Sequence, residues 1–332
     1  ADRTQAPSGA GCALENRLAP TRAFSDVYAE TPVHRLASFF GAFRDTLQTM
    51  KHSGDDRIAV LTPGPLNETY FEHAYIARYL GIMLLEGEDL TVSGGKLMVR
   101  TVSGLKPIGV LWRRLDAAFA DPLELRPDSQ IGTPGLVEAI RSGTVSAVNA
   151  LGSGLMETRA LLSFLPRISK ELRGEELLLP SVATWWCGQD GEREHVLANL
   201  DRMVVGPALS TRLAFEDDDA TRLGSELSDA ERAELVARIK GSGGDFVGQE
   251  AVTLSTTPVY VGGSLEPRPA SLRVYLARTP DGWAVMPGGF ARIGFSLDPT
   301  AIAMQRGGQA ADVWVVSNRP VDRETLLPQE HD

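Results

Sequence analysis

Arginines and carboxylates recur beside Gly or Pro turns at several separated places in the chain, next to strand-like runs. Phosphate chemistry needs this mixture, because cations neutralise phosphate oxygens, carboxylates bind magnesium, and glycines let the backbone approach a ligand closely. The combination predicts a nucleotide site. Its segments are residues 2–9, 61–73, 112–126, 246–250, 272–275 and 286–292.

Gln249 and Glu250 close a predicted strand that leads into Val252. An adenine ring needs backbone donors and acceptors beside an apolar slot, and a strand that ends in a carboxylate can supply them. We expect Glu250 to bind the ribose or the adenine amino group. Each motif is common by itself, because arginines are mostly exposed and glycine pairs mostly form turns. The other candidate nucleotide-site residues in the C-terminal part of the chain are Arg268, Arg273, Gly288, Gly289 and Arg292.

The chain has 332 residues, of which 43% are hydrophobic, enough for two or three domains with real cores. A net charge of -10 argues against nucleic acid as the main partner. The positive charge is nearly all arginine, which high genomic GC content would also produce without a functional cause. An ATP-binding lysine must therefore be one of the few lysines in the chain or be absent. The lysines are Lys51, Lys96, Lys106, Lys170 and Lys240.

Cys12 and Cys187 lack metal-ligand spacing, which predicts a cytoplasmic protein without a disulfide framework. No apolar run reaches the roughly 18 residues of a membrane span, so we expect no membrane partner. The N-terminus has neither Met nor a signal-peptide pattern. We therefore expect the chain to be part of a longer polypeptide.

The elements that must position these residues follow from hydrophobic periodicity. Apolar residues at helical spacing predict an amphipathic helix over 33–50. A strand at 58–61, a helix at 67–80 ended by Gly81, and a strand at 82–85 predict a βαβ unit. Ligands of open α/β sheets lie beyond the carboxyl ends of strands. The loops at residues 63–73 and 113–116 follow such strand ends.

The rest of the chain is less regular. Residues 1–32, rich in Pro, Gly and Ala, are predicted to be irregular. One long helix over 155–172 is expected, kinked or broken at Pro166. Ser228 and Glu231 predict a capping box that begins another helix. Strands are expected to dominate from residue 246 onward.

Several stretches of the sequence are distinctive. In chain order they are ADRTQAPSGAGCALENR, LTPGPLNETYFEHAYIARYLG, LWRRLDAAFADPLELRPDS, RGEELLLPSVATWWCG, DFVGQEAVTLSTTPV, MPGGFARI and MQRGG. Together they resemble the circularly permuted ATP-grasp type 2 family, which is related to the synthetase domain of glutathionylspermidine synthase. The resemblance covers nearly the whole chain. It implies an α/β (α+β) fold, a circularly permuted ATP-grasp-like fold with a Rossmann-like pre-ATP-grasp domain.

The resemblance implies three segments. Residues 1–52 would form the N-terminal metal and phosphate segment and a helix of the ATP-grasp part. Residues 55–190 would form the pre-ATP-grasp α/β domain with a helical linker. Residues 191–332 would form the ATP-grasp domain.

The implied activity is that of an ATP-dependent carboxylate–amine or carboxylate–thiol ligase, which forms an amide or peptide-like bond through an acyl phosphate. ATP and Mg²⁺ would be the cofactors, and peptide-like carboxylates and amines the substrates. Catalysis would consist mostly of positioning and charge neutralisation. The alternative is a degenerate or truncated module that binds nucleotide or peptide without catalysis.

The resemblance also implies roles for individual residues. The catalytic, phosphate-facing residues would be Arg17, Arg273 and Arg292. The metal ligands would be Asp2, Glu15 and Asn16. The nucleotide would contact Gln249, Glu250, Val252, Arg268, Gly288 and Gly289. The acceptor substrate would face Asn67, Glu68, Glu72, His73, Arg113, Arg114 and Asp116.

The chain departs from the family pattern at charged positions. It reads Ala1-Asp2-Arg3 where related synthetases carry Glu-x-Asn, so a cation stands in the metal segment. Gly206 stands on the strand where an ATP-grasp lysine is expected, and Ala311 lies near the position of a second lysine. Arginines, Arg3 among them, could compensate, or the site could be inactive.

Other residues have structural alternatives. His73 has apolar neighbours, and a structural or capping histidine is as good an interpretation as a catalytic one. The pair Trp185-Trp186 favours packing over a ligand platform. The sequence contains neither a Walker A nor a Gly-x-Ser-x-Gly pattern, which argues against P-loop and common hydrolase sites.

Overall fold

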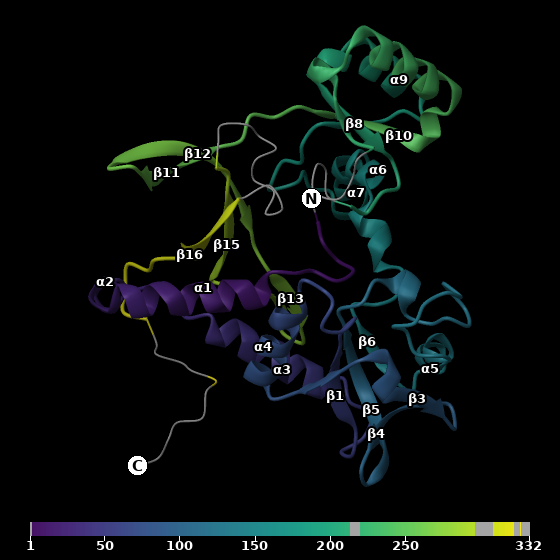
Figure 1. The fold of residues 1–332 in the computed structure, drawn as a ribbon, viewed down its shortest axis with the longest axis vertical. Helices are drawn as coiled ribbons and strands as arrows, with labels where there is room; N and C mark the ends of the chain where they lie inside the picture. Colours follow the sequence, from purple (N-terminus) through teal and green to yellow (C-terminus); the bar gives the residue numbers. More distant parts are fainter. Residues whose placement is uncertain (1, 213–219, 296–307, 322–325, 327–332) are drawn as a thin grey trace. The chain divides into compact units, whose positions relative to one another are not determined.

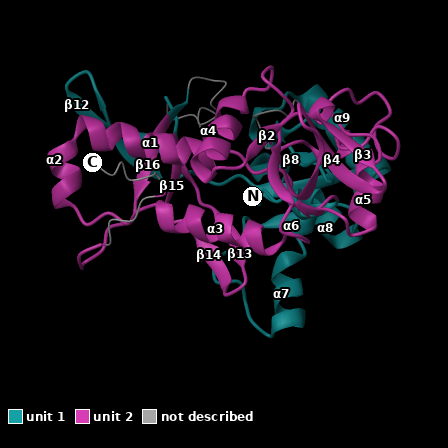
Figure 2. Ribbon diagram, turned by 90° about the horizontal axis from the view of Figure 1, so that it is seen from below, with its two compact units in different colours: residues 1–4, 152–270, 293–309 teal, residues 5–151, 271–292, 310–332 magenta. Residues whose placement is uncertain are grey.

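The computed structural model describes residues 2–212, 220–295, 308–321 and 326 (Figure 1). The chain divides into two compact units, each built from segments that are separated in the sequence (Figure 2). The three continuous segments expected from the sequence are a different kind of division and stay a prediction. Unit 1 consists of residues 1–4, 152–270 and 293–309, and unit 2 of residues 5–151, 271–292 and 310–332.

Unit 2 contains a six-stranded sheet in the order β2-β1-β5-β4-β3, with β6 also paired to β5. β1, β2 and β6 run parallel to the second half of β5, so their carboxyl ends lie at one edge. β3 and β4 extend the sheet as an antiparallel hairpin that turns at Gly94 and Gly95. The strands are β1 (Arg57–Leu61), β2 (Met83–Leu85), β3 (Leu90–Ser93), β4 (Lys96–Thr101), β5 (Gly104–Arg113) and β6 (Ser146–Val148).

The predicted βαβ unit is confirmed. Helix α4 (Tyr70–Leu80) connects β1 to β2 and ends at Gly81, whose φ of 68° is the left-handed conformation that glycine adopts without strain. The predicted amphipathic helix is α3 (Ala37–Thr49), which buries Phe39 and Phe40. The local patterns are strong here because each element has one apolar face and a clear end signal.

The expectation of an irregular N-terminus is wrong. Residues 10–30 form α1 (Ala10–Ala23) and α2 (Ser25–Glu30). Helix α1 carries Pro20 in its interior and has no apolar stripe, so neither its composition nor its periodicity marks it as a helix. It is held by tertiary contacts instead, as the burial of Ala13, Leu14 and Arg17 indicates.

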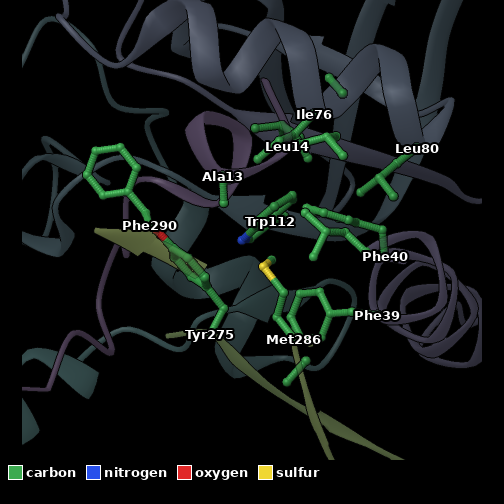
Figure 3. Close-up of a cluster of buried hydrophobic side chains, with 14 residues drawn as sticks. Ala13, Leu14, Phe39, Phe40, Ile76, Leu80, Trp112, Tyr275, Met286 and Phe290 are labelled. Atoms are coloured by element: carbon green, nitrogen blue, oxygen red, sulfur yellow. The ribbon is translucent and has the colours of Figure 1, made fainter. Parts of the chain in front are cut away.

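Helices α1, α3 and α4 share one apolar core with residues from the C-terminal half of the chain. Trp112 from β5 and Met286 lie close together in this core, with Phe39 and Tyr275 nearby (Figure 3). Burial of these large side chains stabilises the unit. The core therefore joins residues 271–292 to the N-terminal half, which explains why unit 2 is discontinuous.

Further short elements complete unit 2. β13 (Leu276–Thr279) and β14 (Gly282–Val285) form a hairpin around Asp281-Gly282. The end of β12 (Ser264–Arg273) lies beside β15 (Gly288–Ile293), which lies beside β16 (Gln309–Trp314). Helix α5 (Leu136–Arg141) packs near β4.

Unit 1 contains an antiparallel sheet in the order β7-β10-β8-β9. Helices α8 and α9 cover one face, where Val196 and Ile239 pack against Val205. In addition, β11 (Thr256–Val261) pairs with β12. The sheet and its helices are β7 (Thr184–Trp186), β8 (Met203–Pro207), β9 (Arg222–Leu223), β10 (Phe246–Glu250), α8 (Asp190–Ala198) and α9 (Asp229–Gly241).

Both helical regions predicted in unit 1 are helical, but one of them is divided into two helices. Ser228 accepts from the Glu231 N–H and forms the predicted capping box of α9. The long helix expected over 155–172 is divided into α6 (Arg159–Leu162) and α7 (Leu165–Arg173), with Pro166 in the first turn of α7. None of the helices in the described part of the chain has the length and apolar character needed to cross a membrane.

Candidate functional site

Glu72 is the centre of a buried polar cluster in unit 2. It lies in the first turn of α4, and its Oε1 accepts a hydrogen bond of 3.2 Å from Arg114 Nη2. Its Oε2 accepts a hydrogen bond of 2.6 Å from the backbone N–H of Gly9. Glu72 therefore links α4, the residue after β5 and the loop before α1. Both Glu72 and Arg114 were predicted to face the acceptor substrate, and the structure brings the two together.

Two further residues extend this cluster from the end of β12. Arg273 Nη1 donates to the backbone oxygen of Ser8 at 3.1 Å and to its hydroxyl at 3.2 Å. The hydroxyl of Tyr275 donates to the same backbone oxygen at 3.2 Å. Gly9 has a φ of 101°, and a Cβ there would collide with the Tyr275 hydroxyl. Glycine is thus required where residues 8 and 9 pass this strand.

Cys12 borders the same cluster, and its thiol donates to Glu72 Oε2 at 3.9 Å. Cys12 is exposed as a residue, but desolvation of its thiol, and secondarily the Glu72 carboxylate, raise the pKa of Cys12 to about 11. Arg273 and Arg292 oppose this shift of the Cys12 pKa, so both guanidinium groups act on the same small region. The predicted phosphate-facing residues Arg273 and Arg292 thus share a neighbourhood with Arg114.

His73 is buried beside this cluster, with 2% of its surface exposed. Its Nδ1 lies 2.9 Å from the Thr62 hydroxyl and its Nε2 lies 3.2 Å from the Thr69 hydroxyl. Burial, and secondarily the charge of Arg114, lower the pKa of His73 to about 3. The ring is therefore neutral at physiological pH and holds the loop between β1 and α4. Its predicted contact with an acceptor substrate stays a prediction.

The other acceptor-facing candidates belong to the same sheet edge. Arg113 is buried and donates to the backbone oxygens of Leu115 and Gln5. Asp116 accepts from the Gln5 side chain at 3.1 Å. Asn67 accepts from the Thr69 backbone at 2.9 Å, and Glu68 is exposed. These contacts order the loops at the carboxyl ends of β1 and β5, as the strand-end argument predicts.

A small pocket opens at this edge, beyond β1 and β2. It has a volume of about 120 Å³ and is lined by Thr62, Pro63, Glu86 and Gln130, among others. Sites for drug-sized ligands have volumes of roughly 300–1,000 Å³, so a whole nucleotide does not fit here. The pocket can hold a small polar group at most.

Arg17, predicted to lie near the transferred phosphate, is engaged on three sides within unit 2. Its Nε forms an ion pair of 2.6 Å with Asp312, and both side chains are almost fully buried. Its other nitrogens donate to the backbone oxygens of His34 and Val313 at 2.9 and 2.8 Å. These contacts fix α1 against β16. The role of Arg17 in catalysis stays a prediction.

The predicted glycine pair Gly288-Gly289 lies on β15. Its backbone is approached closely by other parts of the protein. A Cβ on Gly288 would lie 2.8 Å from both Arg17 Nη2 and a Leu36 methyl carbon. A Cβ on Gly289 would lie 2.6 Å from the backbone oxygen of Arg273. Packing therefore requires both glycines independently of any ligand.

The adenine-site candidates lie in unit 1. Gln249 donates to the Thr184 hydroxyl at 3.1 Å, and the backbone N–H of Glu250 donates to Ala183. Val252 is exposed, and Arg268 forms an ion pair of 2.6 Å with Glu266. Strand β10 does end at Glu250, as predicted. Whether these residues bind adenine stays a prediction.

The predicted metal ligands are divided between the two units. Asp2 belongs to unit 1, whereas Glu15 and Asn16 lie on α1 in unit 2. Among the described residues, no three His, Cys, Asp or Glu side chains come together in a way that could hold a metal ion. The residues placed here do not form a complete magnesium site, and the metal ligands stay a prediction.

Sequence reasoning named most of the cluster around Glu72, but it included Ser8 only as part of the segment 2–9 and missed Cys12. Ser8 acts through its backbone oxygen, which no sequence pattern reveals. Cys12 was interpreted only as a sign of the cellular compartment. The position of Cys12 in the N-terminal stretch, between the predicted metal ligands Asp2 and Glu15, is the signal that could have identified it.

Each of the two units combines sheets with helices. Residues 1–294 match the family of circularly permuted ATP-grasp type 2 proteins, and the chain belongs to this family. The predicted family and fold class are confirmed.

Relatives in bacteria are similar over nearly the whole chain. An uncharacterized protein of Mycobacterium tuberculosis is 39% identical over 326 residues, which cover 97% of this chain and 35% of the relative. An uncharacterized protein of Synechocystis is 33% identical over 317 residues, which cover 95% of this chain and 65% of the relative. The chain thus spans between about a third and two thirds of these relatives. 

One solved structure is also similar. It is a glutathione synthetase-like effector from Globodera pallida in its apo form, with a TM-score of 0.41 and 10% sequence identity. The likeness covers 84% of this chain and 55% of the effector.

Proposed function

We propose that this chain is part of an ATP-dependent ligase that joins a carboxylate to an amine or a thiol. Family membership supports ATP as the nucleotide. The observation that carries the proposal is the buried pair of Arg114 and Glu72 in unit 2, beside which Arg273 binds Ser8, and Arg273 and Arg292 both act on the thiol of Cys12. We further propose peptide-like substrates and a cytoplasmic location, without nucleic acid or membrane partners, in keeping with the acidic charge of -10.

The arginine cluster suits an anionic ligand. The Nε of Arg114 is buried without a hydrogen-bond partner in the described residues, and only one of its Nη atoms bonds Glu72. Guanidinium groups bind phosphate and carboxylate oxygens through paired N–H donors. When bound, ATP would supply the phosphoryl group that activates the substrate carboxylate. In our proposal Arg273 and Arg292 neutralise phosphate charge, and Glu72 orients Arg114 toward the acceptor.

The attacking nucleophile must then come from a substrate. Cys12, with a pKa of about 11, is protonated at neutral pH and is not a thiolate nucleophile. His73, with a pKa of about 3, is a poor proton acceptor. Neither side chain near Glu72 can start covalent catalysis, which favours direct attack by a substrate amine or thiol.

A second candidate function is a module that binds nucleotide without turnover. It is favoured by Gly206 on β8 and Ala311 on β16, where the family resemblance leads us to expect lysines. It is also favoured by Arg17, whose guanidinium is engaged by Asp312 and two backbone oxygens. Both candidates require ATP to bind, and they differ in whether ADP is released.

Calorimetry of ATP binding, with and without Mg²⁺, tests the proposal. We expect wild-type protein to bind ATP, Arg273→Ala to bind it at least about tenfold more weakly, since one charge-assisted pair is lost, and the exposed control Arg141→Ala to be unchanged. Absence of binding at millimolar ATP would sink both candidates. If ATP binds, ADP release in the presence of mixed amino acids and polyamines distinguishes the ligase from the binding module.

A further inference from the structure

The small pocket at the carboxyl edge of the unit 2 sheet has no part in the proposed reaction. Its lining comes from the end of β1, from the turn after β2 that leads into the 3-10 helix η1 (Gly87–Asp89), and from the loop before α5. All three segments belong to unit 2. The volume of about 120 Å³ suits one small chemical group. The lining residues are Thr62, Pro63, Glu86, Gly87, Glu88, Gln130 and Ile131.

Close backbone contacts hold the walls of this pocket together. A Cβ on Gly87 would collide with the backbone oxygen of Ile131 and would lie 2.8 Å from that of Gly132. The Thr133 hydroxyl donates to the backbone oxygen of Gly87 at 3.3 Å. Residues 86–88 therefore pack directly against the loop at residues 130–133. This packing forms the pocket in advance of ligand binding, which lowers the entropic cost of binding.

The Glu86 side chain occupies space that Gly64 leaves open. A Cβ built on Gly64 would lie 2.8 Å from Glu86 Oε2, so any larger residue there would push the carboxylate aside. The backbone of Glu86 is fixed as well, because its N–H donates to Asp89 Oδ2 at 2.9 Å. The half-buried Glu86 carboxylate is thus kept at the pocket by the residues on both sides of it.

The charged groups in the pocket lining are all negative. Glu86 and Glu88 supply two carboxylates, and no Lys, Arg or His is among the lining residues. Arg100 approaches this turn, but it donates to the backbone oxygens of Glu88 and Leu90. Within the described part of the chain, neither carboxylate has an ion-pair partner. Two like charges beside one small space repel each other, and a bound cation would remove this repulsion.

A primary ammonium group matches this lining. It is a compact positive charge with three N–H donors. The carboxylates of Glu86 and Glu88 are acceptors, and the side-chain oxygen of Gln130 can provide a third. A metal ion fits less well, because no three His, Cys, Asp or Glu side chains of the described residues come together as a metal would require.

We propose that this pocket binds the primary ammonium group of an alkylamine, either a free amine or a lysine side chain. Leu66 offers apolar surface for the alkyl part. It is fully exposed in the turn after Pro63, which the Asn67 N–H closes by donating to the Gly64 oxygen at 3.1 Å. A protonated amine has no lone pair with which to attack, so the group bound here serves recognition and is not the nucleophile of a ligase reaction.

Titration of the intact chain with butylamine at pH 7, followed by ¹H–¹⁵N NMR, tests the inference. Butylamine is protonated at this pH, since alkylammonium groups such as that of lysine have a pKa of about 10.4. The backbone amide signal of Gly87, which lines the pocket, should shift and reach saturation. The signal of Gly262, in the turn between β11 and β12 of unit 1, should not move.

Two compounds separate charge from hydrogen bonding. Butanol keeps the alkyl chain without the charge, and butyltrimethylammonium keeps the charge without N–H donors. Neither should give a saturable shift of the Gly87 signal. An equal response to either compound, or no response to butylamine, would overturn the inference. KCl at the same concentration is the third control, and a shift equal to that caused by butylamine would show a site for inorganic cations and would also overturn it.

Variants of the two glutamates connect binding to the pocket. Glu86→Gln should weaken butylamine binding at least about tenfold, because one charge-assisted pair is lost. Glu88→Gln, whose side chain is more exposed, should weaken it by a smaller factor and provides the second variant if Glu86→Gln does not fold. Glu234→Gln, exposed on α9 in unit 1, is the matched control and should bind like wild type. Unchanged affinity in both pocket variants would contradict the inference.

A capped lysine, Nα-acetyl-lysine methylamide, distinguishes the two sources of the alkylammonium group. Tighter binding than that of butylamine assigns the pocket to a lysine of a peptide, and equal or weaker binding assigns it to a free amine. None of these measurements requires ATP. Amine binding without ATP binding would therefore leave this inference standing while the proposed function fails, and the reverse result would reject the inference alone.

Discussion

Glu72 and Arg114 form an ion pair of 3.2 Å whose side chains are only 3% and 2% exposed. Neither residue can be removed without leaving an opposite charge in a medium of low polarity. The pair connects the first turn of α4 to the end of β5, and through Glu72 Oε2 it also fixes Gly9 before α1. Three segments that are far apart in the sequence thus depend on one carboxylate.

Replacing Glu72 by Ala should destabilise the protein by about 3–5 kcal/mol, because Arg114 would remain as an uncompensated buried charge. Urea unfolding followed by circular dichroism measures the change. Glu68→Ala, in the loop just before α4, is the matched control; its side chain is exposed, and a change within about 0.5 kcal/mol is expected. Equal effects of the two substitutions would show that the buried pair contributes no more to the free energy of unfolding than an exposed side chain does.

The pair also illustrates what sequence can and cannot predict. The strand at 58–61, the helix ended by Gly81 and the loops at the strand ends follow from local patterns, and the structure has all of them. Glu72 and Arg114 could be named as candidates because the family resemblance implies that both face the acceptor substrate. Their pairing could not be predicted, because it depends on the register of β1 and β5, which periodicity does not fix.

Helix α1 and Glu86 show the same limit more sharply. Residues 10–23 lack an apolar stripe, and their helix is stabilised by Arg17, which contacts Asp312 and Val313 at the other end of the chain. Glu86 belongs to no motif at all, and its relation to Gly64 appears only when the turn after β2 is placed against the loop after β1. Long-range contacts of this kind leave no trace in local spacing.

His73 predicts a pH dependence of stability. Its folded pKa of about 3 lies below the ordinary value of 6.5, so between these values the unfolded chain binds the proton more strongly. This contribution to stability is complete above pH 6.5 and is lost as the pH falls toward 3. From pH 7 to pH 5, the His73 contribution to the free energy of unfolding should fall by about 2 kcal/mol.

The comparison of wild type with His73→Gln isolates this term, because the variant lacks the titrating ring. Urea unfolding at pH 7 and pH 5 should show a smaller decrease for His73→Gln by about 2 kcal/mol. His52, which is exposed, supplies the control: His52→Gln should keep the wild-type dependence. An identical decrease in all three proteins would mean that His73 is accessible to protons in the folded state.

Arg17 and Asp312 allow a comparison of buried and exposed ion pairs in one chain. Arg17→Met should destabilise the protein by about 3–5 kcal/mol, because it leaves the buried Asp312 carboxylate without its cation, with the Trp314 indole N–H as a remaining donor. Arg44→Met, which removes the exposed pair with Asp45, should cost no more than about 1 kcal/mol. Thermal and urea unfolding provide the measurements. A small effect of Arg17→Met on stability would instead favour the predicted role of Arg17 in phosphate binding.

Cys12 provides a chemical test of the cluster around Glu72. A thiol with a pKa of about 11, instead of the ordinary 9.0, has about 100-fold less thiolate at pH 8. Alkylation of Cys12 by iodoacetamide, followed by peptide mass spectrometry to separate it from Cys187, should therefore be slow at pH 8 and accelerate about tenfold per pH unit up to about pH 11.

Glu72→Gln removes the negative charge that helps to hold the thiol protonated, so it should shift the alkylation profile of Cys12 to lower pH. The shift should be partial, since burial of the thiol is the larger cause of its raised pKa. Glu68→Gln, which changes an exposed carboxylate in the loop just before α4, should leave the profile unchanged. Rapid labelling of wild-type Cys12 at pH 7 would contradict the geometry of the cluster and would make Cys12 itself a candidate nucleophile.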